Sequence, residues 1–263
     1  MGATAIAARI QLPRAASPSD HASACGLTFD QPGGPLVAVC GLTGGAGTST
    51  LALALARQAA AESTAPVLVT ESGGGRGSLA VMTRHATPHR LADLARSIAD
   101  DRVPADTFVE LDAGLRLVAA TPRRHEPAPP TAVRVLLGQA RDAHGLVVVD
   151  CGTDWTADSP ILASATHLIW TVPATAAGLG RARILLDSDV VPTPGRWREV
   201  LAATASARRP SVSVRALRRL AKQRCDRLVL IAHDHALADG EPSGGESIMR
   251  ALSGLAPALR SEP

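Results

Sequence analysis

The sequence predicts an α/β protein of three layers, with a doubly wound, mainly parallel sheet of about seven strands between two layers of helices. Two observations predict this class. Short runs rich in Val, Leu and Ile show little polar alternation, which is typical of parallel strands buried on both faces. Segments of about ten to fifteen residues with helical character separate these runs, which indicates right-handed βαβ crossovers.

Each expected strand corresponds to one of these apolar runs. The expected strands span residues 36–40, 66–70, 115–119, 146–150, 167–172, 199–203 and 227–232. The expected helices lie between them, at residues 49–61, 89–99, 131–143, 174–186, 212–224 and 246–259. A short extended segment at 107–110 faces 115–118 across Asp112, Ala113 and Gly114, and this turn predicts a small antiparallel hairpin.

The domain organisation is simple. A chain of 263 residues suits one domain with a sizeable core. Residues 1–33 are rich in Ala, Ser, Pro and Gly and lack sustained periodicity, so we expect a flexible leader there. The sequence has no internal repeat, and residues 34–263 form the single expected domain.

The composition argues against several classes of function. Aromatic residues make up 2% of the chain and Tyr is absent, which argues against stacking platforms for single-stranded nucleic acid. The net charge of +3 permits contact with nucleic acid or an anionic membrane without requiring it. The four cysteines form no CxxC pair, so no zinc site is expected. No signal peptide is evident and no apolar run approaches the roughly 18 residues of a membrane span, so we expect a cytoplasmic protein without a transmembrane segment.

The most informative segment is the glycine-rich turn GLTGGAGTST at residues 41–50, between the first expected strand and the first expected helix. In this context backbone N–H groups and a helix N-terminus bind phosphate. The P-loop pattern requires Lys and then Ser or Thr after its last glycine, but Gly47 is followed by Thr48 and Ser49. The only lysine in the chain is Lys222. The turn therefore has the shape of a phosphate-binding loop without its cation.

Acidic residues close two neighbouring strands of the predicted sheet. The second expected strand is followed by Glu71 and a glycine run, and the fourth ends in Asp150. Ligands of doubly wound sheets bind outside the carboxyl ends of the strands. An acid beside a glycine loop suits water-mediated coordination of Mg²⁺, which prefers oxygen ligands.

Over roughly residues 35–232 the chain resembles the MinD/ParA branch of the P-loop ATPases. The loop of that family reads KGGxGKT[TS], and TGGAGTST occupies the same frame. Thr43 and Thr48 replace the two lysines of the family. There the first lysine reaches across a dimer to the partner's nucleotide, and the second holds the phosphates in its own subunit. The second strand of the family usually ends in DxD, for which this chain has Glu71 and Gly73, whereas the fourth-strand aspartate matches as Asp150.

This resemblance implies the site residues and the cofactor. The expected ligand is ATP or ADP with Mg²⁺, and Mg²⁺ is expected at Ser49 and Asp150. No residue is expected to be catalytic, because Thr43, Thr48 and Gly73 stand where hydrolysis needs charge stabilisation and an oriented water. The expected nucleotide contacts are Gly44, Gly45, Ala46, Gly47, Thr48, Ser49, Thr50 and Asp150.

The altered lysine positions and the glycine run after the second strand are most similar to one offshoot, the CpaE/TadZ and septum-site-determining-like proteins. Members of that offshoot place pilus or secretion machinery in the cell, and several carry degraded nucleotide loops. The leading hypothesis is therefore a positioning protein that binds nucleotide weakly or not at all, with weak or no ATP hydrolysis. Its expected partners are a second copy across the loop face and a protein such as a pilus or secretion ATPase.

Two alternatives stay open. An active ATPase could use a non-lysine cation, for which Arg76 is the candidate, although an arginine beside three glycines is more often simply solvated. A DNA-binding partition protein would use a basic helix face such as those of ParA-type proteins. Arg215, Arg218, Arg219 and Lys222 lie at the spacing of one such face, which also suits a solvated helix.

Three further patterns carry weaker expectations. The last helix aligns Ile248, Leu252, Leu255 and Leu259, which suits either a membrane-docking helix as in MinD or, given Pro257, packing on the sheet. Residues 233–235, His-Asp-His, end the last strand, where related ATPases contact adenine; a metal site there lacks a third ligand nearby. Cys40 and Cys151 should be neighbouring buried thiols, with a redox pair as the alternative.

Overall fold

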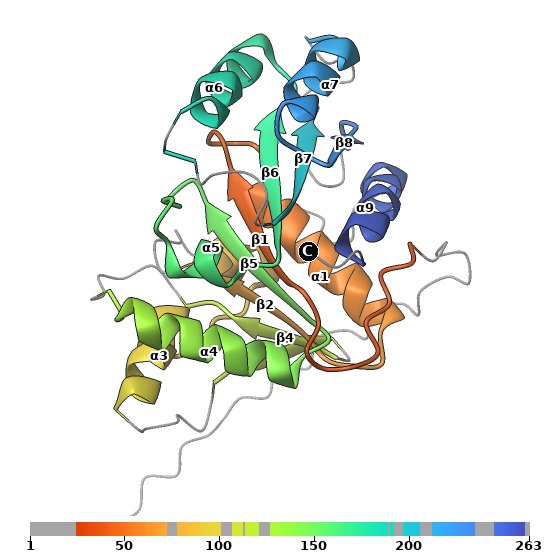
Figure 1. Cartoon of the computed structure of the whole chain (residues 1–263). Coiled ribbons are helices and arrows are strands. Elements are labelled where there is room, and N and C mark those ends of the chain that lie inside the picture. The colour runs from red at the N-terminus through yellow and green to blue at the C-terminus, as the bar shows by residue number, and fades with distance from the viewer. Residues whose placement is uncertain are drawn as a thin grey trace, which may run out of the picture.

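The computed structural model describes residues 25–72, 78–100, 107–112, 114–120, 127–188, 190–191, 197–205, 212–234 and 245–260. The strands in this part of the chain are β1 (Leu36–Gly41), β2 (Val67–Glu71), β3 (Val109–Asp112), β4 (Leu115–Val118), β5 (Leu146–Gly152), β6 (His167–Pro173), β7 (Arg198–Thr204) and β8 (Arg227–Ile231). They form one eight-stranded sheet in the order β3-β4-β2-β5-β1-β6-β7-β8 (Figure 1). Only β3 runs antiparallel, in a hairpin with β4.

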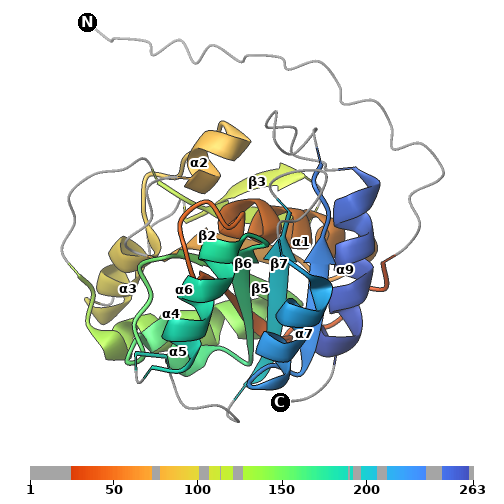
Figure 2. The same ribbon diagram turned by 90° about the horizontal axis from the view of Figure 1, so that it is seen from above.

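Helices cover both faces of this sheet (Figure 2). One face packs α1 (Thr48–Glu62), α2 (Ser78–Thr83) and α9 (Glu246–Leu259), and the other packs α3 (Leu91–Ala99), α4 (Pro130–Ala143), α5 (Pro160–Ser164), α6 (Ala176–Leu186) and α7 (Val214–Lys222). Each face has its own cluster of buried apolar residues. The predicted three-layer, doubly wound fold is confirmed.

The central strand β1 positions the loop. It pairs in parallel with β5 on one side and β6 on the other, and all six of its residues are buried. Its carboxyl end therefore meets those of β5 and β6 at the same end of the sheet. Strands β2 to β5 lie on one side of β1 and strands β6 to β8 lie on the other, so the direction in which strands are added reverses at β1. Such a reversal is where doubly wound sheets bind ligands.

The predicted elements agree with the structure except at short helices, at the strand count and at ends of α3, α6 and α7, which differ by two residues. The first hairpin strand joins the sheet, so the sheet has eight strands among the described residues rather than about seven. Helices α2 and α5 were not predicted, because six and five residues are too few to show a helical period. Helix α6 begins two residues later than expected because Thr175 caps it, its hydroxyl accepting from Gly178 N–H at 3.0 Å.

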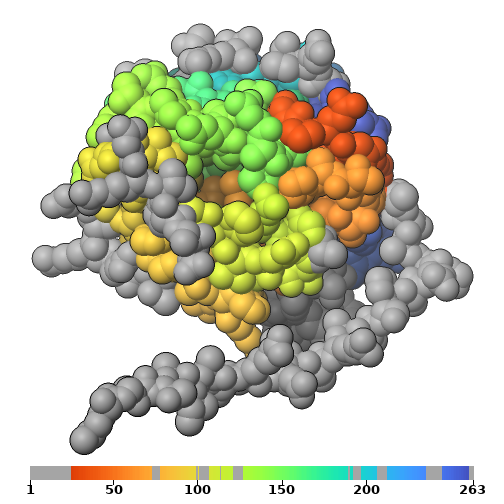
Figure 3. All heavy atoms as spheres, turned by 90° about the horizontal axis from the view of Figure 1, so that it is seen from below, coloured from red at the N-terminus to blue at the C-terminus, as the bar shows by residue number. Residues whose placement is uncertain are grey.

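The described part of the expected leader, residues 25–33, packs on the domain, which corrects its assignment to a flexible leader. Cys25, Leu27 and Phe29 are buried beside α1 and α9. The Glu62 carboxylate at the end of α1 accepts from Cys25 N–H at 2.5 Å and from Leu27 N–H at 2.7 Å. Figure 3 shows this segment against the end of α1 on the underside of the molecule. Residues 1–24 lie outside the described residues.

Helix α9 has the predicted bounds and packs on the sheet. Ile248, Leu252, Leu255 and Leu259 are all at most 1% exposed, and the helix contacts β7, β8 and α1. Its apolar face is therefore part of the core rather than available to a membrane. Among the helices described, none is both long enough and apolar enough to cross a bilayer.

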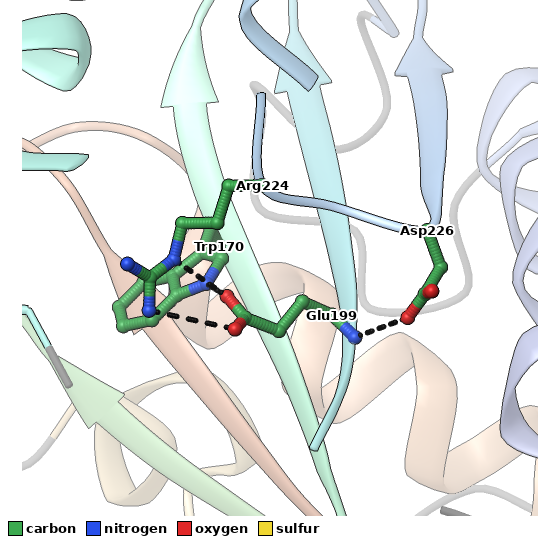
Figure 4. A network of polar contacts seen from close by, with 4 residues as sticks. All are labelled: Trp170, Glu199, Arg224 and Asp226. Carbon is green, nitrogen blue, oxygen red and sulfur yellow. Dashed lines mark hydrogen bonds and ion pairs between the residues drawn. The ribbon is translucent and has the colours of Figure 1, made fainter. Parts of the chain in front are cut away.

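A buried ion pair fixes the chain after α7 to the middle of β6 and to the amino end of β7 (Figure 4). Arg224 Nε lies 2.8 Å from Glu199 Oε2, and the two side chains are 6% and 2% exposed. Trp170 Nε1 donates to the same carboxylate at 2.6 Å, and Asp226 accepts from Glu199 N–H at 2.9 Å. Because its hydrogen bonds are met, this network orients α7 without an uncompensated buried charge.

Candidate functional site

The glycine-rich loop joins β1 to α1 in an open conformation. Gly45 and Gly47 have φ values of 73° and 77°, in the left-handed region that favours glycine. Leu42 N–H donates to the Thr171 carbonyl at 2.9 Å, and Thr204 Oγ1 donates to the Ala46 carbonyl at 3.0 Å. Neighbouring strands thus hold the loop near both of its ends. Helix α1 begins directly after Gly47, so its N-terminal amides face the space outside the sheet edge.

Thr48, which stands where the loop pattern requires lysine, is turned into the fold. Its side-chain oxygen lies 2.7 Å from that of Thr171, and Thr48 is 8% exposed. The same oxygen lies only 2.8 Å from the position that a Cβ on Gly41 would take. Gly41 therefore lets this hydroxyl pair form beneath the loop. A hydrogen-bonded, uncharged side chain replaces the cation.

Thr43, at the position of the other family lysine, has a different environment. Its hydroxyl oxygen is buried yet has no hydrogen-bond partner among the described residues. Thr43 lines cavities on both sides of the loop. Leaving a buried hydroxyl unpaired costs about 1–3 kcal/mol, so a bound polar group would gain this contact.

Ser49 and Asp150 are the residues at which the sequence predicts magnesium. Ser49 and Asp150 line the same cavity, and Asp150 Oδ1 accepts from Gly152 N–H at 3.0 Å. Burial raises the pKa of Asp150, and interactions with Ser49 and with Gly152 N–H oppose the rise. In the described residues no three His, Cys, Asp or Glu side chains form a metal cluster of their own. The pair fits Mg²⁺ that takes its remaining ligands from water and phosphate.

Glu71 lies next to Asp150 in the β2–β5 register. Its carboxylate accepts from Leu79 N–H at the start of α2, so it holds that helix beside the loop. Burial raises the pKa of Glu71; the Leu79 N–H contact lowers it and the charge of Asp150 raises it further. Gly73 and Arg76, which the sequence analysis singled out, lie outside the described residues.

Three cavities adjoin the loop. The first, of about 500 Å³, extends over the loop to Glu71, Asp150 and Asp154. The second, of about 190 Å³, shares Gly45, Gly47 and Thr50 with it and reaches the ends of β7 and β8. The third, of about 670 Å³, shares Thr43 and Gly44 with the first and reaches α6. The space that a nucleotide would need is thus open. All seven predicted loop contacts line the first cavity, together with Asp150: Gly44, Gly45, Ala46, Gly47, Thr48, Ser49 and Thr50.

Thr171, which contacts Thr48, and the lining residues Thr204, Trp155 and Arg181 were not predicted. The threonines are polar residues in apolar strands, and that contrast was a signal for them. Trp155 follows β5 and Arg181 follows β6, so both are placed next to the loop by the pairing of these strands with β1.

The end of β8 is joined to α9 by a polar contact. Asp234 Oδ2 accepts from Gly245 N–H and from the Ser247 hydroxyl, both at 2.8 Å, and so joins β8 to the start of α9. His233 and Asp234 line the second cavity. His235 lies outside the described residues.

The remaining sequence predictions concern thiols and the basic helix. Cys40 and Cys151 are buried free thiols, and burial raises the pKa of Cys40, with a hydrogen bond to Cys151 adding to the rise.

On α7, Leu217, Leu220 and Ala221 are buried. The four basic residues of this helix are all exposed, as expected for one solvent-facing side: Arg215, Arg218, Arg219 and Lys222.

Comparison with known proteins adds information on the fold alone. No family model and no curated protein matches the chain significantly. A ParA family ATPase from Chlorobium tepidum TLS is 17% identical, with a TM-score of 0.63 over 86% of this chain and 99% of the other. A chain of the MinC:MinD cell division complex from Aquifex aeolicus is 16% identical, with a TM-score of 0.62 over 87% and 98%. An McdA variant from Cyanothece, solved with ATP, is 15% identical, with a TM-score of 0.62 over 88% and 98%. The chain has the fold of the ParA/MinD P-loop ATPases.

Proposed function

We propose that this chain is a cytoplasmic positioning or regulatory protein of the CpaE/TadZ type, which binds ATP or ADP with Mg²⁺ weakly and hydrolyses ATP slowly or not at all. One observation carries the proposal: an open loop with left-handed Gly45 and Gly47 leads into α1, where Ser49 and Asp150 line the same cavity. Backbone amides at a helix N-terminus bind phosphate without side-chain help. The Cyanothece neighbour was solved with ATP, which is consistent with this use of the fold.

The charges around the loop make the expected binding weak. The cavity over the loop is lined by Glu71, Asp150 and Asp154, and by no arginine or lysine among the described residues. Loss of one charge-assisted hydrogen bond costs about 1.5–3 kcal/mol, or about one to two decades in affinity. Mg²⁺ between Ser49, Asp150 and the phosphates would offset the repulsion from the carboxylates.

The second cavity is the proposed site of the adenine base. It begins at the loop glycines and extends between Thr204, Ile231 and Ile248. Such a mainly apolar pocket next to a phosphate loop suits a flat base, and His233 and Asp234 also line it. The nucleotide would then extend from this pocket over the loop towards Asp150.

At the described positions around the loop, the charged groups that ATP hydrolysis usually uses are replaced or occupied. Thr48 is hydrogen-bonded beneath the loop and Glu71 holds Leu79 N–H, so neither supplies a cation or a base for water among the described residues. Phosphoryl transfer needs charge stabilisation at the γ-phosphate and an oriented water. The competing proposal, an active ATPase that uses Arg76, predicts that Arg76→Ala abolishes turnover.

The proposed mode of action is partner binding. Val81 and Val190 are 73% and 51% exposed and line the first and third cavities, so apolar side chains flank the loop face. A second copy of the chain covering this face would bury them. A protein partner such as a pilus or secretion ATPase would then bind the dimer. Among the structural neighbours, the Aquifex aeolicus protein was solved in a complex of MinC with MinD.

The test is calorimetric titration of the purified chain with Mg-ATP and Mg-ADP, together with a phosphate-release assay. We expect saturable binding weaker than micromolar and no turnover above background. Asp150→Ala should weaken binding in the presence of Mg²⁺, whereas the matched control Asp158→Ala, at an exposed residue of the same segment, should not. Absence of binding by the wild type would contradict nucleotide binding. Micromolar or tighter binding with turnover that Asp150→Ala removes would contradict the non-catalytic part.

A second candidate function, nonspecific DNA binding, has one observation in its favour: the exposed basic side of α7. Phosphate contacts of this kind weaken steeply with salt. Reversal of charge at Arg215, Arg218 and Arg219 should then abolish retention on DNA at low salt, and the control Arg250→Glu, at a side chain of α9 that is 74% exposed, should not. Lack of any gel shift by the wild type at low salt would exclude this candidate.

A further inference from the structure

The third cavity, beside the loop, is walled by α6 and by the segment after β5. Its volume is about 670 Å³, and it opens onto Thr43 and Gly44. Helix α6 contributes one face, made by Ala177, Gly178, Arg181 and Leu185. None of the nucleotide contacts predicted from the sequence requires this cavity.

The wall of this cavity is held in place by specific contacts. Trp155 Nε1 donates to the Gly41 carbonyl at 2.9 Å, and its ring packs edge-on against Trp170 with centroids 4.9 Å apart. The start of α6 is capped by Thr175, whose hydroxyl accepts from Gly178 N–H. The cavity is therefore a built feature of the fold, with the positive end of the α6 dipole at its edge.

Two polar side chains that line this cavity have no evident structural role. Arg181 is exposed and lines the cavity, and it is the one arginine or lysine among the described residues that line any of the three cavities. The Thr43 hydroxyl, on the opposite wall, is the buried oxygen without a hydrogen-bond partner. A cation and an unpaired hydroxyl on one cavity indicate an anionic ligand group.

The connection between the cavities suggests which anion this is. The first and third cavities meet at Thr43, Gly44 and Thr153, so a phosphate chain lying over the loop can continue into the third cavity. The carboxylates of Glu71, Asp150 and Asp154 line only the first cavity. The end of a triphosphate would therefore meet positive charge on the α6 side.

We propose that Arg181 and Thr43 form a subsite for the terminal phosphate of a nucleoside triphosphate held at the loop. Arg181 supplies from α6 the positive charge that the threonines at positions 43 and 48 cannot supply. This proposal rests on the proposed function, since it requires a nucleotide at the loop. A charge placed here favours ATP over ADP, because only ATP has the phosphate that reaches the subsite.

The test compares the affinities of the intact chain for Mg-ATP and Mg-ADP by calorimetry. Arg181→Ala should weaken Mg-ATP binding by about ten- to a hundredfold and Mg-ADP binding by far less. Arg181→Lys should restore part of the ATP preference because it keeps the charge. The matched control is Arg183→Ala, since Arg183 lies on the same helix, is 71% exposed and pairs with Asp187. Thr43→Val, which removes only the hydroxyl, should reduce the ATP preference by a smaller factor.

The outcomes separate this proposal from the proposed function. If the wild type binds ATP and ADP and Arg181→Ala changes both equally or not at all, the subsite is wrong and nucleotide binding stands. If the wild type binds neither nucleotide, both proposals fail. Arg181 is exposed, so the thermal unfolding of the variant should match the wild type and verify that the comparison reports on binding.

Discussion

The two threonines that replace the family lysines differ in what they contact. Thr48 is hydrogen-bonded to Thr171 and is part of the packing between α1 and β6. Thr43 has an unpaired hydroxyl between two cavities. Replacement of lysine by threonine therefore adds a buried hydrogen bond at position 48, whereas at position 43 it leaves a hydroxyl without a partner among the described residues. Sequence could predict that charge was absent at both positions, but only the strand pairing shows which side chain is buried.

Gly47→Ala should weaken nucleotide binding. The φ of 77° at Gly47 costs about 1–2 kcal/mol for a residue with a Cβ, and the loop must shift to relieve it. We expect a loss of about tenfold in Mg-ADP affinity by calorimetry. Gly180→Ala, in α6 with open space around the added Cβ, serves as the control and should leave the affinity unchanged. Equal affinities for the two variants would show that the loop conformation does not matter for binding.

Glu71→Gln should stabilise the folded chain at neutral pH. Burial raises the pKa of Glu71 above its ordinary value of 4.5, so between pH 4.5 and the raised pKa the folded state keeps a proton that the unfolded state has lost. The folded state accordingly loses stability as pH rises from 4.5 through the raised pKa. Glutamine keeps an oxygen for Leu79 N–H and carries no charge. A gain of about 2–4 °C in the unfolding temperature at pH 7 corresponds to about 1 kcal/mol, the size that we expect.

The pH dependence provides the control for this variant. Below pH 4.5 the carboxyl is protonated in both states, so the difference between Glu71→Gln and the wild type should shrink towards zero. The unfolding temperatures of both proteins should be compared between pH 4 and pH 7 by circular dichroism. A difference that stays constant over this range would exclude the charge as its cause.

At the scale of elements, prediction succeeded where a period could be seen. Helix α9 has its predicted bounds because Ile248, Leu252, Leu255 and Leu259 repeat at helical spacing. Helices α2 and α5 are too short to show a helical period in the sequence. Residues 25–33 were assigned to a leader because of their Pro and Gly, although apolar residues alternate there at Cys25, Leu27 and Phe29. That alternation was the available signal for a segment packed on one side.

Leu27→Ala tests whether this N-terminal segment belongs to the core. Leu27 is 0% exposed and packs with α1 and α9, so we expect a loss of about 2–5 kcal/mol in the free energy of unfolding. Urea denaturation measures this loss. Ile184→Ala, at a residue that is 70% exposed on α6, is the matched control and should change stability by less than about 0.5 kcal/mol. A similarly small effect of Leu27→Ala would mean that the segment adds nothing to the fold.

At the scale of the whole molecule, the strand order explains how distant segments form one site. Residues of the loop, of β5 and of β2 were predicted from the acids and glycines at strand ends. Arg181 and Trp155 could not be predicted, because their place beside the loop depends on β6 and β5 lying next to β1. A likeness of about 15–17% identity to ParA/MinD structures places the fold and leaves ligand and partner to experiment.

The central claim is that backbone amides at the start of α1 still bind phosphate in a chain without either lysine. A crystal structure of the chain with Mg²⁺ and a non-hydrolysable ATP analogue tests it most directly. We predict phosphates over residues 44–50 and Mg²⁺ between Ser49 and Asp150, with the terminal phosphate towards Arg181. A loop closed by its own side chains, or an analogue bound elsewhere while the loop stays empty, would contradict the claim.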